Sequence, residues 1–190
     1  MTEADDRSMY ERMLAGDLYI ADDPAITEAH QRAVDLTTAY NATTARQGEE
    51  RRDLLDRLLG SVGARTEIRP PFQVDYGKQI HIGEGTFANY GLVALDVATI
   101  TIGDDVQIGP NVQLLTPTHP LESGPRRDKW EAAMPITIGD NVWLGGGVIV
   151  LPGVTIGENT VVGAGAVVTR DLPANVLAVG NPARVVREIE

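Results

Sequence analysis

Residues 138–168 read IGDNVWLGGGVIVLPGVTIGENTVVGAGAVV, and in this stretch an aliphatic side chain returns at every sixth position. The same register holds over residues 102–114. The nine aliphatic residues that share it are Ile102, Ile108, Leu114, Ile138, Leu144, Val150, Ile156, Val162 and Val168. A period of six fits neither an α-helix nor a two-faced strand, but it suits a coil of short strands in which every sixth side chain points to the axis. Three hexapeptides, about 18 residues, complete one triangular coil, so the pattern predicts a parallel β-helix.

Residues 1–70 show the spacing of helices instead. A capping box at Ser8-Met9-Tyr10-Glu11 predicts the start of a short first helix, and Gly16 predicts its end. Asp23 before Pro24 predicts the start of a second helix. Its apolar residues, at alternating spacings of three and four, are Ile26, Ala29, Ala33, Leu36 and Tyr40. We therefore expect a small helical segment before the β-helix.

A boundary between the two parts is expected at Pro70-Pro71, because neither residue can continue a helix or a central strand. Before it, a third helix is expected from about Gly48 to Leu59. After it, residues 71–190 are expected to form the β-helix domain. The six-residue pattern disappears at about residues 115–135, which predicts an inserted loop. Loops of that length in compact domains are usually functional or disordered, and the His, Trp, Glu and Arg residues here favour function.

Composition narrows the function. The 16 Lys and Arg residues against 27 Asp and Glu residues give a formal net charge of −11, which argues against a nucleic-acid or anionic-membrane binder. There is no Cys, which excludes disulfides, thiolate metal sites and a covalent thiol intermediate. The N-terminus, Met1-Thr2-Glu3-Ala4-Asp5-Asp6, has no basic segment with an apolar run behind it, and nothing downstream approaches the ~20 apolar residues of a spanning helix. We expect a cytoplasmic protein that requires no metal.

Four short motifs accompany the repeat: residues 13–19 (Met-Leu-Ala-Gly-Asp-Leu-Tyr), Ala88-Asn89-Tyr90, Thr118-His119-Pro120 and residues 179–184 (Val-Gly-Asn-Pro-Ala-Arg). In combination with the repeat, they resemble the maltose and galactoside O-acetyltransferases, which include nodulation-factor acetyltransferases. The resemblance covers nearly the whole chain. It implies a left-handed parallel β-helix, acetyl-CoA as co-substrate and transfer of the acetyl group to a hydroxyl of a sugar. It also implies a homotrimer with the acceptor and CoA sites between subunits.

His119 is the predicted general base, at the position where the resemblance places the active histidine. Acetyl transfer needs a base that removes the hydroxyl proton and returns it to the departing thiolate, and imidazole titrates in the right range. The alternative is a loop histidine that is hydrogen-bonded for structure. Ser8, Ser61 and Ser123 lie in no Gly-x-Ser-x-Gly elbow, so we expect direct transfer in a ternary complex. Glu131 is expected to orient His119 or to bind acceptor, with a solvated loop carboxylate as the ordinary alternative.

The oxyanion of the tetrahedral intermediate needs preorganised donors, and backbone N–H groups of Gly145-Gly146-Gly147 are candidates. The resemblance points to the N–H of Gly146, where some relatives carry serine. The alternative is that the three glycines only ease a tight corner.

Acidic and amide groups are expected to bind the sugar hydroxyls. The residues that the resemblance implies are Asp22, Asp75, Asn89, Asp96 and Glu131. Asn89 is also expected to orient the reacting hydroxyl. Asp23 competes with Asp22, but its position before a helix favours capping. Val97 competes with Asp96, because one relative's aspartate aligns there.

Coenzyme A carries several phosphates, which an acidic protein must meet with local cations or N–H groups. The contacts that the resemblance implies are Trp143, Gly146, Ala164, Thr169, Arg170, Arg184 and Arg187, along the outside of the helix to its last coils. Trp143 is adjacent to the inward Leu144, so it should face outward, where CoA or a subunit would cover it. Arg170 replaces a lysine that is common in the family and keeps its charge.

Three alternative functions stand beside this one. A β-helix carbonic anhydrase would need three convergent histidines, which the separation of His30, His81 and His119 disfavours. We expect His30 and His81 to be structural or solvated. A non-catalytic β-helix assembly protein would not need a histidine at the start of a loop. An acetyltransferase acting on serine or on an antibiotic is the nearest enzymatic alternative.

Overall fold

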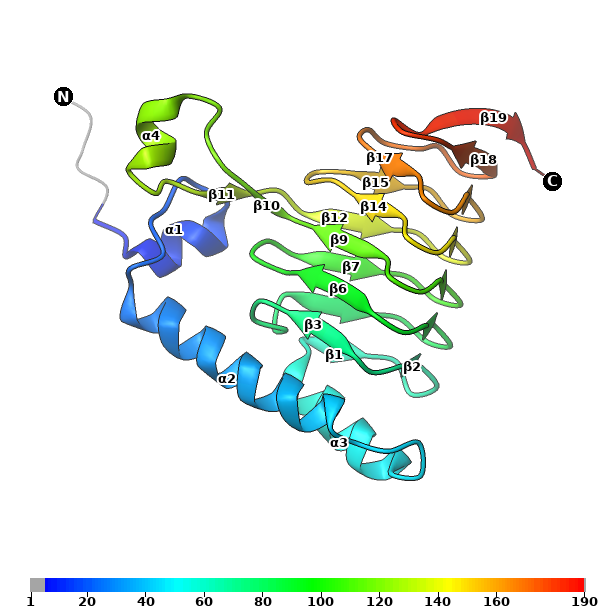
Figure 1. Cartoon of the computed structure of the whole chain (residues 1–190), viewed down its shortest axis with the longest axis horizontal. Coiled ribbons are helices and arrows are strands. Elements are labelled where there is room, and N and C mark those ends of the chain that lie inside the picture. Colours follow the sequence, from blue (N-terminus) through cyan, green and yellow to red (C-terminus); the bar gives the residue numbers. More distant parts are fainter. Residues whose placement is uncertain (1–5, 190) are drawn as a thin grey trace.

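The computed structural model describes residues 6–189. The stretch Met1–Asp5, which is part of the argument for a cytoplasmic protein, lies outside the described residues. The helices before the solenoid are α1 (Met9–Ala15), α2 (Pro24–Asn41) and α3 (Gly48–Leu58). A β-solenoid is stacked above the helices α2 and α3, and the short helix α1 and an inserted segment project at one side (Figure 1). The predicted capping box of Ser8 and Glu11 is present, and Gly16 ends α1 at a φ of 79°. No described helix is long and apolar enough to cross a membrane.

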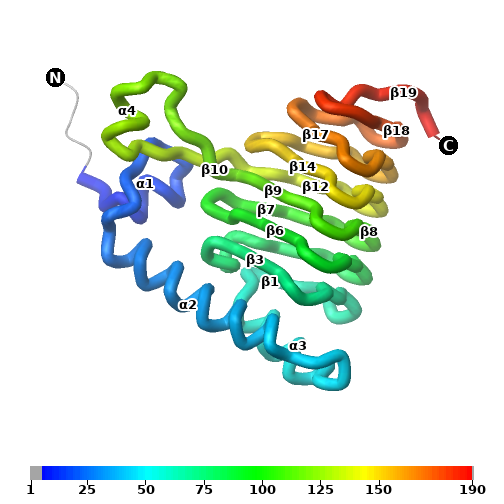
Figure 2. Tube along the Cα trace, in the orientation of Figure 1, coloured from blue at the N-terminus to red at the C-terminus, as the bar shows by residue number. Residues whose placement is uncertain are grey.

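Short parallel strands form the three sides of the solenoid. Sheet 1 contains β1 (Ser61–Val62), β4 (Ile80–Ile82), β7 (Ile100–Ile102), β12 (Ile136–Ile138) and β15 (Thr155–Ile156). Sheet 2 contains β2 (Glu67–Ile68), β5 (Phe87–Ala88), β8 (Gln107–Ile108), β13 (Trp143–Leu144), β16 (Val161–Val162), β18 (Val176–Val179) and β19 (Arg184–Glu188), the last of which returns antiparallel. Sheet 3 contains β3 (Phe72–Val74), β6 (Leu92–Leu95), β9 (Gln113–Leu115), β14 (Ile149–Val150) and β17 (Val167–Val168). The chain visits the sheets in turn, and Figure 2 follows these coils as one tube.

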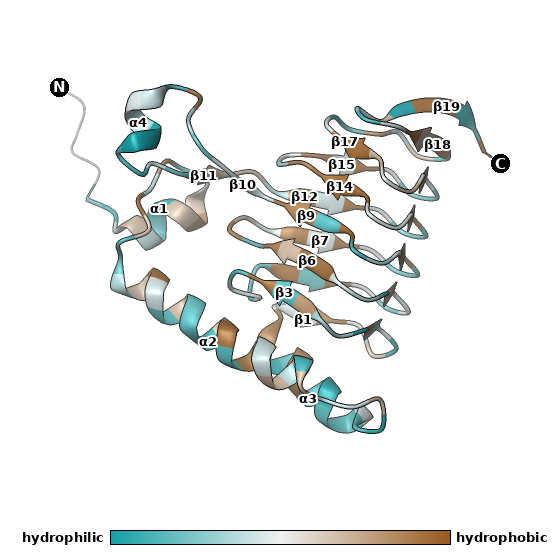
Figure 3. Cartoon of the chain, viewed as in Figure 1, coloured by the Kyte–Doolittle hydropathy of each residue, from teal (hydrophilic) through white to brown (hydrophobic). Residues whose placement is uncertain are grey.

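The six-residue register is confirmed by burial. All nine predicted aliphatic side chains are at most 2% exposed. They stack directly in layers, as where Ile138 pairs with Ile102 in one neighbouring coil and with Ile156 in the other. Apolar residues accordingly recur along the stacked strands of the solenoid in Figure 3. Each fully buried side chain of this kind stabilises the fold by ~1.5–3 kcal/mol, so the stack is the main core of the protein.

One corner of the early coils is wider than the others. Ile138 and Ile156, paired in consecutive late coils, are 18 positions apart, whereas Ile82 and Ile102 in early coils are 20 positions apart. The two extra residues lie between sheet 3 and sheet 1. This corner, which we call the wide corner, consists of residues 75–79, residues 96–99 and the inserted segment 116–135.

The predicted insertion is an ordered structure. Its two ends pair as the antiparallel strands β10 (Pro117–Thr118) and β11 (Ala132–Ala133), and α4 (Ser123–Arg127) lies between them. The Arg126 guanidinium donates to the carbonyls of Pro120 and Leu121 at 3.0 and 2.8 Å. These bonds hold the turn of the chain between β10 and α4.

The solenoid begins earlier than the expected boundary at Pro70-Pro71. Strand β1 starts at Ser61 and already pairs with β4 of the next coil. The two prolines lie at the corner between β2 and β3. Their missing N–H groups cost no hydrogen bond of the ladder there. The Pro71 carbonyl still accepts from Gly91 N–H at 3.0 Å. The prolines therefore turn the chain within the first coil.

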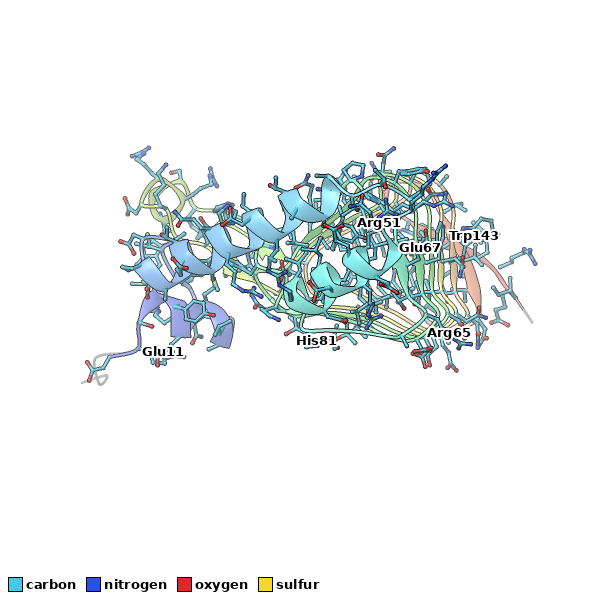
Figure 4. All side chains as sticks on the ribbon, turned by 90° about the horizontal axis from the view of Figure 1, so that it is seen from below. Glu11, Arg51, Arg65, Glu67, His81 and Trp143 are labelled. Carbon is cyan, nitrogen blue, oxygen red and sulfur yellow. The ribbon has the colours of Figure 1, made fainter. Side chains whose placement is uncertain are left out.

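Helices α2 and α3 cover the open end of the first coil, as the view from below shows (Figure 4). The α3 side chains of Leu54, Leu55 and Leu58 are buried there. The ring of Tyr40 on α2 meets Phe72 of β3 edge to face, with 6.5 Å between ring centroids. The helices thus close the apolar core at its N-terminal end.

Candidate active site

The wide corner joins the N-terminal segment to the inserted segment through Tyr19 and Glu131. Their backbones exchange two hydrogen bonds of 2.9 Å, and the Tyr19 hydroxyl donates to Glu131 Oε2 at 2.9 Å. Burial, together with the adjacent Glu131 carboxylate, raises the pKa of Tyr19 far above its usual range. Tyr19 therefore stays a protonated donor that holds the carboxylate in place.

His119 follows β10 directly and is exposed. Its Nδ1 lies 3.4 Å from the carbonyl oxygen of Trp130. A carbonyl can only accept, so this contact requires a proton on Nδ1 and leaves Nε2 as the basic nitrogen. Because Glu131 follows Trp130, the same hairpin positions the imidazole and the carboxylate.

Asp75 is a half-buried carboxylate at the same corner. Burial raises the pKa of Asp75, with a lowering contribution from His30 and a further raising contribution from Glu131. The His30 Nδ1 lies 3.1 Å from the Asp75 carbonyl oxygen, which gives this histidine the structural contact expected for it. The wide corner therefore brings Asp75, Glu131 and His119 to one side of the molecule.

Asp96 is placed differently from the expectation that it contacts acceptor. It is fully buried, and its Oδ1 accepts from the backbone N–H groups of Asp75 at 3.1 Å and Tyr76 at 2.9 Å. Its Oδ2 accepts from Gln79 N–H at 3.2 Å. The extra residues of the wide corner leave these donors without ladder partners, and the carboxylate satisfies them. The competing position, Val97, is also buried, so the structure gives Asp96 a structural contact in place of the expected acceptor contact.

The two candidate N-terminal aspartates have different environments. Asp23 caps α2, where its Oδ1 accepts from Ala25 N–H at 2.8 Å and its Oδ2 accepts from Tyr10 N–H at 3.0 Å. These backbone hydrogen bonds lower the pKa of Asp23. Asp22 is exposed, and its carboxylate has no hydrogen bond within the part of the chain that the structure describes. The capping role of Asp23 is confirmed, and acceptor binding by Asp22 stays a prediction.

A second group of expected site residues lies between sheet 2 and sheet 3. This corner, which we call the glycine corner, consists of residues 89–91, 109–111, 145–147 and 163–165. Asn89 lines a shallow groove of about 140 Å³ there together with Trp143. The Asn89 Oδ1 accepts from Tyr90 N–H at 2.8 Å, which leaves its amide NH₂ as a donor toward the groove.

The structural requirement for glycine differs among the three consecutive residues Gly145, Gly146 and Gly147. A Cβ on Gly145 would lie 2.5 Å from the backbone nitrogen of Ala164, and Gly147 has a φ of 69°. Gly146 has neither restriction, because a Cβ there would meet Pro110 only at 3.3 Å. Among residues 6–189, the N–H of Gly146 has no acceptor, whereas those of its two neighbours donate within the solenoid. Easing the corner explains Gly145 and Gly147 but not Gly146.

The expected CoA contacts fall into two sets. Trp143 is 55% exposed and faces outward, as predicted. It belongs to an outward row across sheet 2 that continues toward the C-terminal coils through paired positions at Val161, Leu177 and Arg187. Arg184 lies on the same β19, and Ala164 lies at the glycine corner. Thr169 and Arg170 are exposed beyond β17, on the opposite edge of sheet 3.

Within a single chain, sheet 3 therefore lies between two groups of candidate residues. His119, Asp75 and Glu131 lie at one edge of this sheet, and Asn89 and Gly146 lie at the other. The four residues of β6 that separate the corners span about 13 Å. In the described region, no three His, Asp or Glu side chains are placed to hold a metal ion. His81 faces outward on a different side from Trp143 (Figure 4), with its Nδ1 3.0 Å from Ser61 Oγ.

Comparison with known proteins decides the family. Residues 12–63 match the maltose acetyltransferase hexapeptide capping motif, and residues 135–170 match the bacterial transferase hexapeptide repeats. Nodulation protein L of Rhizobium meliloti is 48% identical over 94% of this chain and 98% of its own length. The galactoside O-acetyltransferase of Escherichia coli is 42% identical over 95% of this chain and 89% of its own length. The chain belongs to the maltose and galactoside O-acetyltransferase family.

Solved structures agree with this assignment. A maltose O-acetyltransferase from Clostridium difficile 630 is 46% identical, with a TM-score of 0.95 over 97% of this chain and 98% of that chain. A galactoside acetyltransferase in complex with coenzyme A is 41% identical, with a TM-score of 0.93 over 97% of this chain and 92% of that chain. The resemblance drawn from the sequence motifs is therefore confirmed, and the chain is an acetyltransferase of this O-acetyltransferase family.

Sequence reasoning missed Tyr19 as a residue of the candidate site. The residue closes the motif at residues 13–19, but a tyrosine in a helical segment gives no indication that it pairs with the far end of an insertion. Its signal in the structure is a large polar side chain that is only 1% exposed. Tyr19 thus fixes the carboxylate of Glu131 at the candidate site.

Proposed function

We propose that this O-acetyltransferase moves the acetyl group of acetyl-CoA to a hydroxyl of a sugar of the maltose, glucoside or galactoside type. The observation that carries the proposal is the contact of His119 Nδ1 with the Trp130 carbonyl, which leaves Nε2 as a base at an exposed corner that also carries the carboxylates of Asp75 and Glu131. The complex of a 41% identical galactoside acetyltransferase with coenzyme A supports the donor.

The reaction proceeds by direct transfer in a ternary complex. His119 Nε2 removes the proton of the sugar hydroxyl as its oxygen attacks the thioester carbonyl carbon. A C–O bond forms, and the N–H of Gly146 stabilises the resulting oxyanion. The intermediate collapses with cleavage of the C–S bond, and His119 returns its proton to the CoA thiolate. The products are the acetylated sugar and CoA.

The acceptor is held by hydrogen bonds to its hydroxyl groups. The carboxylates of Asp75, Asp22 and Glu131 accept from these hydroxyls, and the NH₂ of Asn89 donates to the reacting oxygen and orients it. Tyr19 supports Glu131 in this role, because its hydroxyl fixes the carboxylate.

The donor lies along the outer row of sheet 2. Trp143 packs on the pantetheine, and the N–H of Gly146 faces the thioester. The backbone at Ala164 and the side chain of Thr169 contact the rest of the molecule, and Arg170, Arg184 and Arg187 meet its phosphates. The position of Arg187 in one row with Trp143 supports this path.

The active assembly is a homotrimer with sites between its subunits. The outward residues of sheet 1 are polar: Ser61, His81, Thr101, Thr137 and Thr155. Apolar residues on the outer faces of sheets 2 and 3 include Phe87, Trp143, Val161, Leu177, Val93, Ile149 and Val167. Two sides that carry outward apolar residues and one polar side suit a closed ring of three copies. Such a ring joins the glycine corner of one copy to the wide corner of the next, which unites Asn89 with His119. Sedimentation at about three times the 20.4 kDa chain mass supports the trimer, and a fully active monomer contradicts it.

The test of the function is thiol release from acetyl-CoA over a panel of acceptors. The panel contains maltose, glucosides, galactosides and chitin fragments, with serine and an aminoglycoside antibiotic as non-sugar acceptors. Saturable release with a sugar, and an acetylated sugar as product, supports the proposal. Release with serine or the antibiotic alone assigns the protein to the alternative acceptor class. Absence of thiol release with every acceptor of the panel contradicts the proposal and favours a non-catalytic assembly protein.

A further inference from the structure

The wide corner poses a problem that a regular solenoid does not have. Its two extra residues per coil take backbone N–H groups out of the ladder between neighbouring coils. In the first coil this affects residues 75–79, the segment that carries Asp75. Asp96 of the second coil solves it, since its two carboxylate oxygens accept from the N–H groups of Asp75, Tyr76 and Gln79. The Gln79 side chain donates in return to the Asp96 carbonyl at 2.8 Å.

The next coil repeats the arrangement with Thr116. This residue is fully buried, its Oγ1 donates to the Leu95 carbonyl at 2.7 Å, and the same oxygen accepts from Ala98 N–H at 3.0 Å. Thr116 therefore holds the backbone on both sides of Asp96. It also immediately precedes β10, the strand that leads to His119.

We infer that Asp96 is a positioning residue of the acceptor site, which fixes the backbone of Asp75 and, through the corner held by Thr116, ties it to the strand that leads to His119. The inference rests on the proposed function, in which Asp75 binds the acceptor. Asp96 itself does not touch the sugar. Its role is to keep an acceptor-binding carboxylate and the general base at a fixed separation.

The geometry requires a carboxylate and not its amide. Three N–H donors from one segment converge on two oxygens, and an ionised carboxylate has enough lone pairs for all of them. An Asn side chain offers one oxygen and one NH₂, so either Gln79 N–H or the N–H groups of Asp75 and Tyr76 would face another donor. Burial raises the pKa of Asp96 to about 6, so the carboxylate is ionised in an assay at pH 7.5.

The chain offers a matched control in Thr86. It is 1% exposed and lies in the same coil, but at the corner between sheets 1 and 2. Its Oγ1 donates to Gly103 O at 2.9 Å and accepts from Val106 N–H at 3.0 Å. Thr86→Val therefore removes a buried polar group of the solenoid away from the wide corner.

The experiment compares Asp96→Asn, Thr86→Val and wild type by initial rates of thiol release, with acceptor and acetyl-CoA varied in turn. We expect Asp96→Asn to lower kcat/KM for the sugar about 10- to 100-fold, as displacement of a binding group by about 1 Å does, with the KM for acetyl-CoA within about twofold of wild type. Thr86→Val should change neither KM, although it lowers the melting temperature. In the Asp75→Asn background, Asp96→Asn should add little, because both changes act on one contact.

A second pair covers the case in which Asp96→Asn does not fold. Thr116→Val removes the hydroxyl that holds the Asp96 corner and should weaken use of the sugar selectively, whereas Thr116→Ser keeps the hydroxyl and should restore it. Equal effects of Asp96→Asn on both substrates, or effects that match Thr86→Val, overturn the inference. A wild-type protein that acetylates no sugar overturns the proposed function instead.

Discussion

The hydroxyl of Tyr19 donates a 2.9 Å hydrogen bond to the carboxylate of Glu131, a residue 112 positions further along the chain. The bond ties the segment between α1 and α2 to the last residues of the inserted hairpin. The inserted segment, with His119 near its start, is therefore anchored at both ends: by the solenoid through Thr116 and by the helical segment through Tyr19.

Tyr19→Phe tests this anchor. The change keeps the ring in its buried position but leaves the Glu131 carboxylate without its donor. We expect the free energy of unfolding to fall by about 1.5–3 kcal/mol, the range for a lost hydrogen bond to a charged group. We also expect a lower kcat/KM for the sugar. Urea unfolding and thiol release measure the two effects, and wild-type values in both would remove Tyr19 from the site.

The C-terminal arginines test the donor path. Replacing Arg184 and Arg187 with alanine should raise the KM for acetyl-CoA more than the KM for the sugar, because both are assigned to CoA phosphates. The effect should shrink at high salt, which screens exposed charges in the wild type as well. A change confined to the sugar KM would contradict the assignment.

The glycine corner gives a prediction about stability. Gly145→Ala places a Cβ 2.5 Å from a backbone nitrogen, so it should lower the free energy of unfolding by about 1–3 kcal/mol or more. Gly146→Ala meets Pro110 at 3.3 Å and should be tolerated far better. Thermal unfolding of the two variants compares them directly. Equal destabilisation would mean that Gly146 is there for space, as its neighbours are.

Asp96 predicts a pH dependence of stability. Burial raises its pKa from 3.8 to about 6 in the folded chain, so the folded state binds this proton more tightly than the unfolded state does. The stability that Asp96 contributes is full below pH 3.8 and is lost as the pH rises through about 6. The free energy of unfolding of wild type relative to Asp96→Asn should thus fall between pH 5 and pH 7.5. Urea unfolding across that range measures it, and a difference that grows with pH would contradict the assigned environment.

The solenoid was predictable because its signal is periodic. Ile138, Leu144 and Val150 are each aliphatic at the inward position of the six-residue register, and every further coil repeats this pattern. Local signals were equally direct at the helix ends, where Ser8 and Gly16 cap α1. The motif Thr118-His119-Pro120 and the interruption of the repeat placed His119 on an inserted segment.

What escaped prediction depends on contacts between distant residues. The sequence around Asp96 does not show that each early coil has two extra residues at the wide corner. It therefore does not show that the Asp96 carboxylate hydrogen-bonds to the backbone of the preceding coil. Pro70-Pro71 looked like a boundary, because a sequence does not show that both residues sit at a corner. The separation of Asn89 from His119 across sheet 3 also becomes visible only once the strands are assigned to three sides.

The general base is the central claim, and His119→Ala tests it most directly. The measurement is thiol release with a sugar that the wild type acetylates, together with calorimetric binding of acetyl-CoA to the same variant. Because the imidazole carries the proton in both directions, kcat should fall at least about 100-fold while acetyl-CoA binding stays within about twofold of wild type. A variant that binds acetyl-CoA and turns over at the wild-type rate would contradict the account.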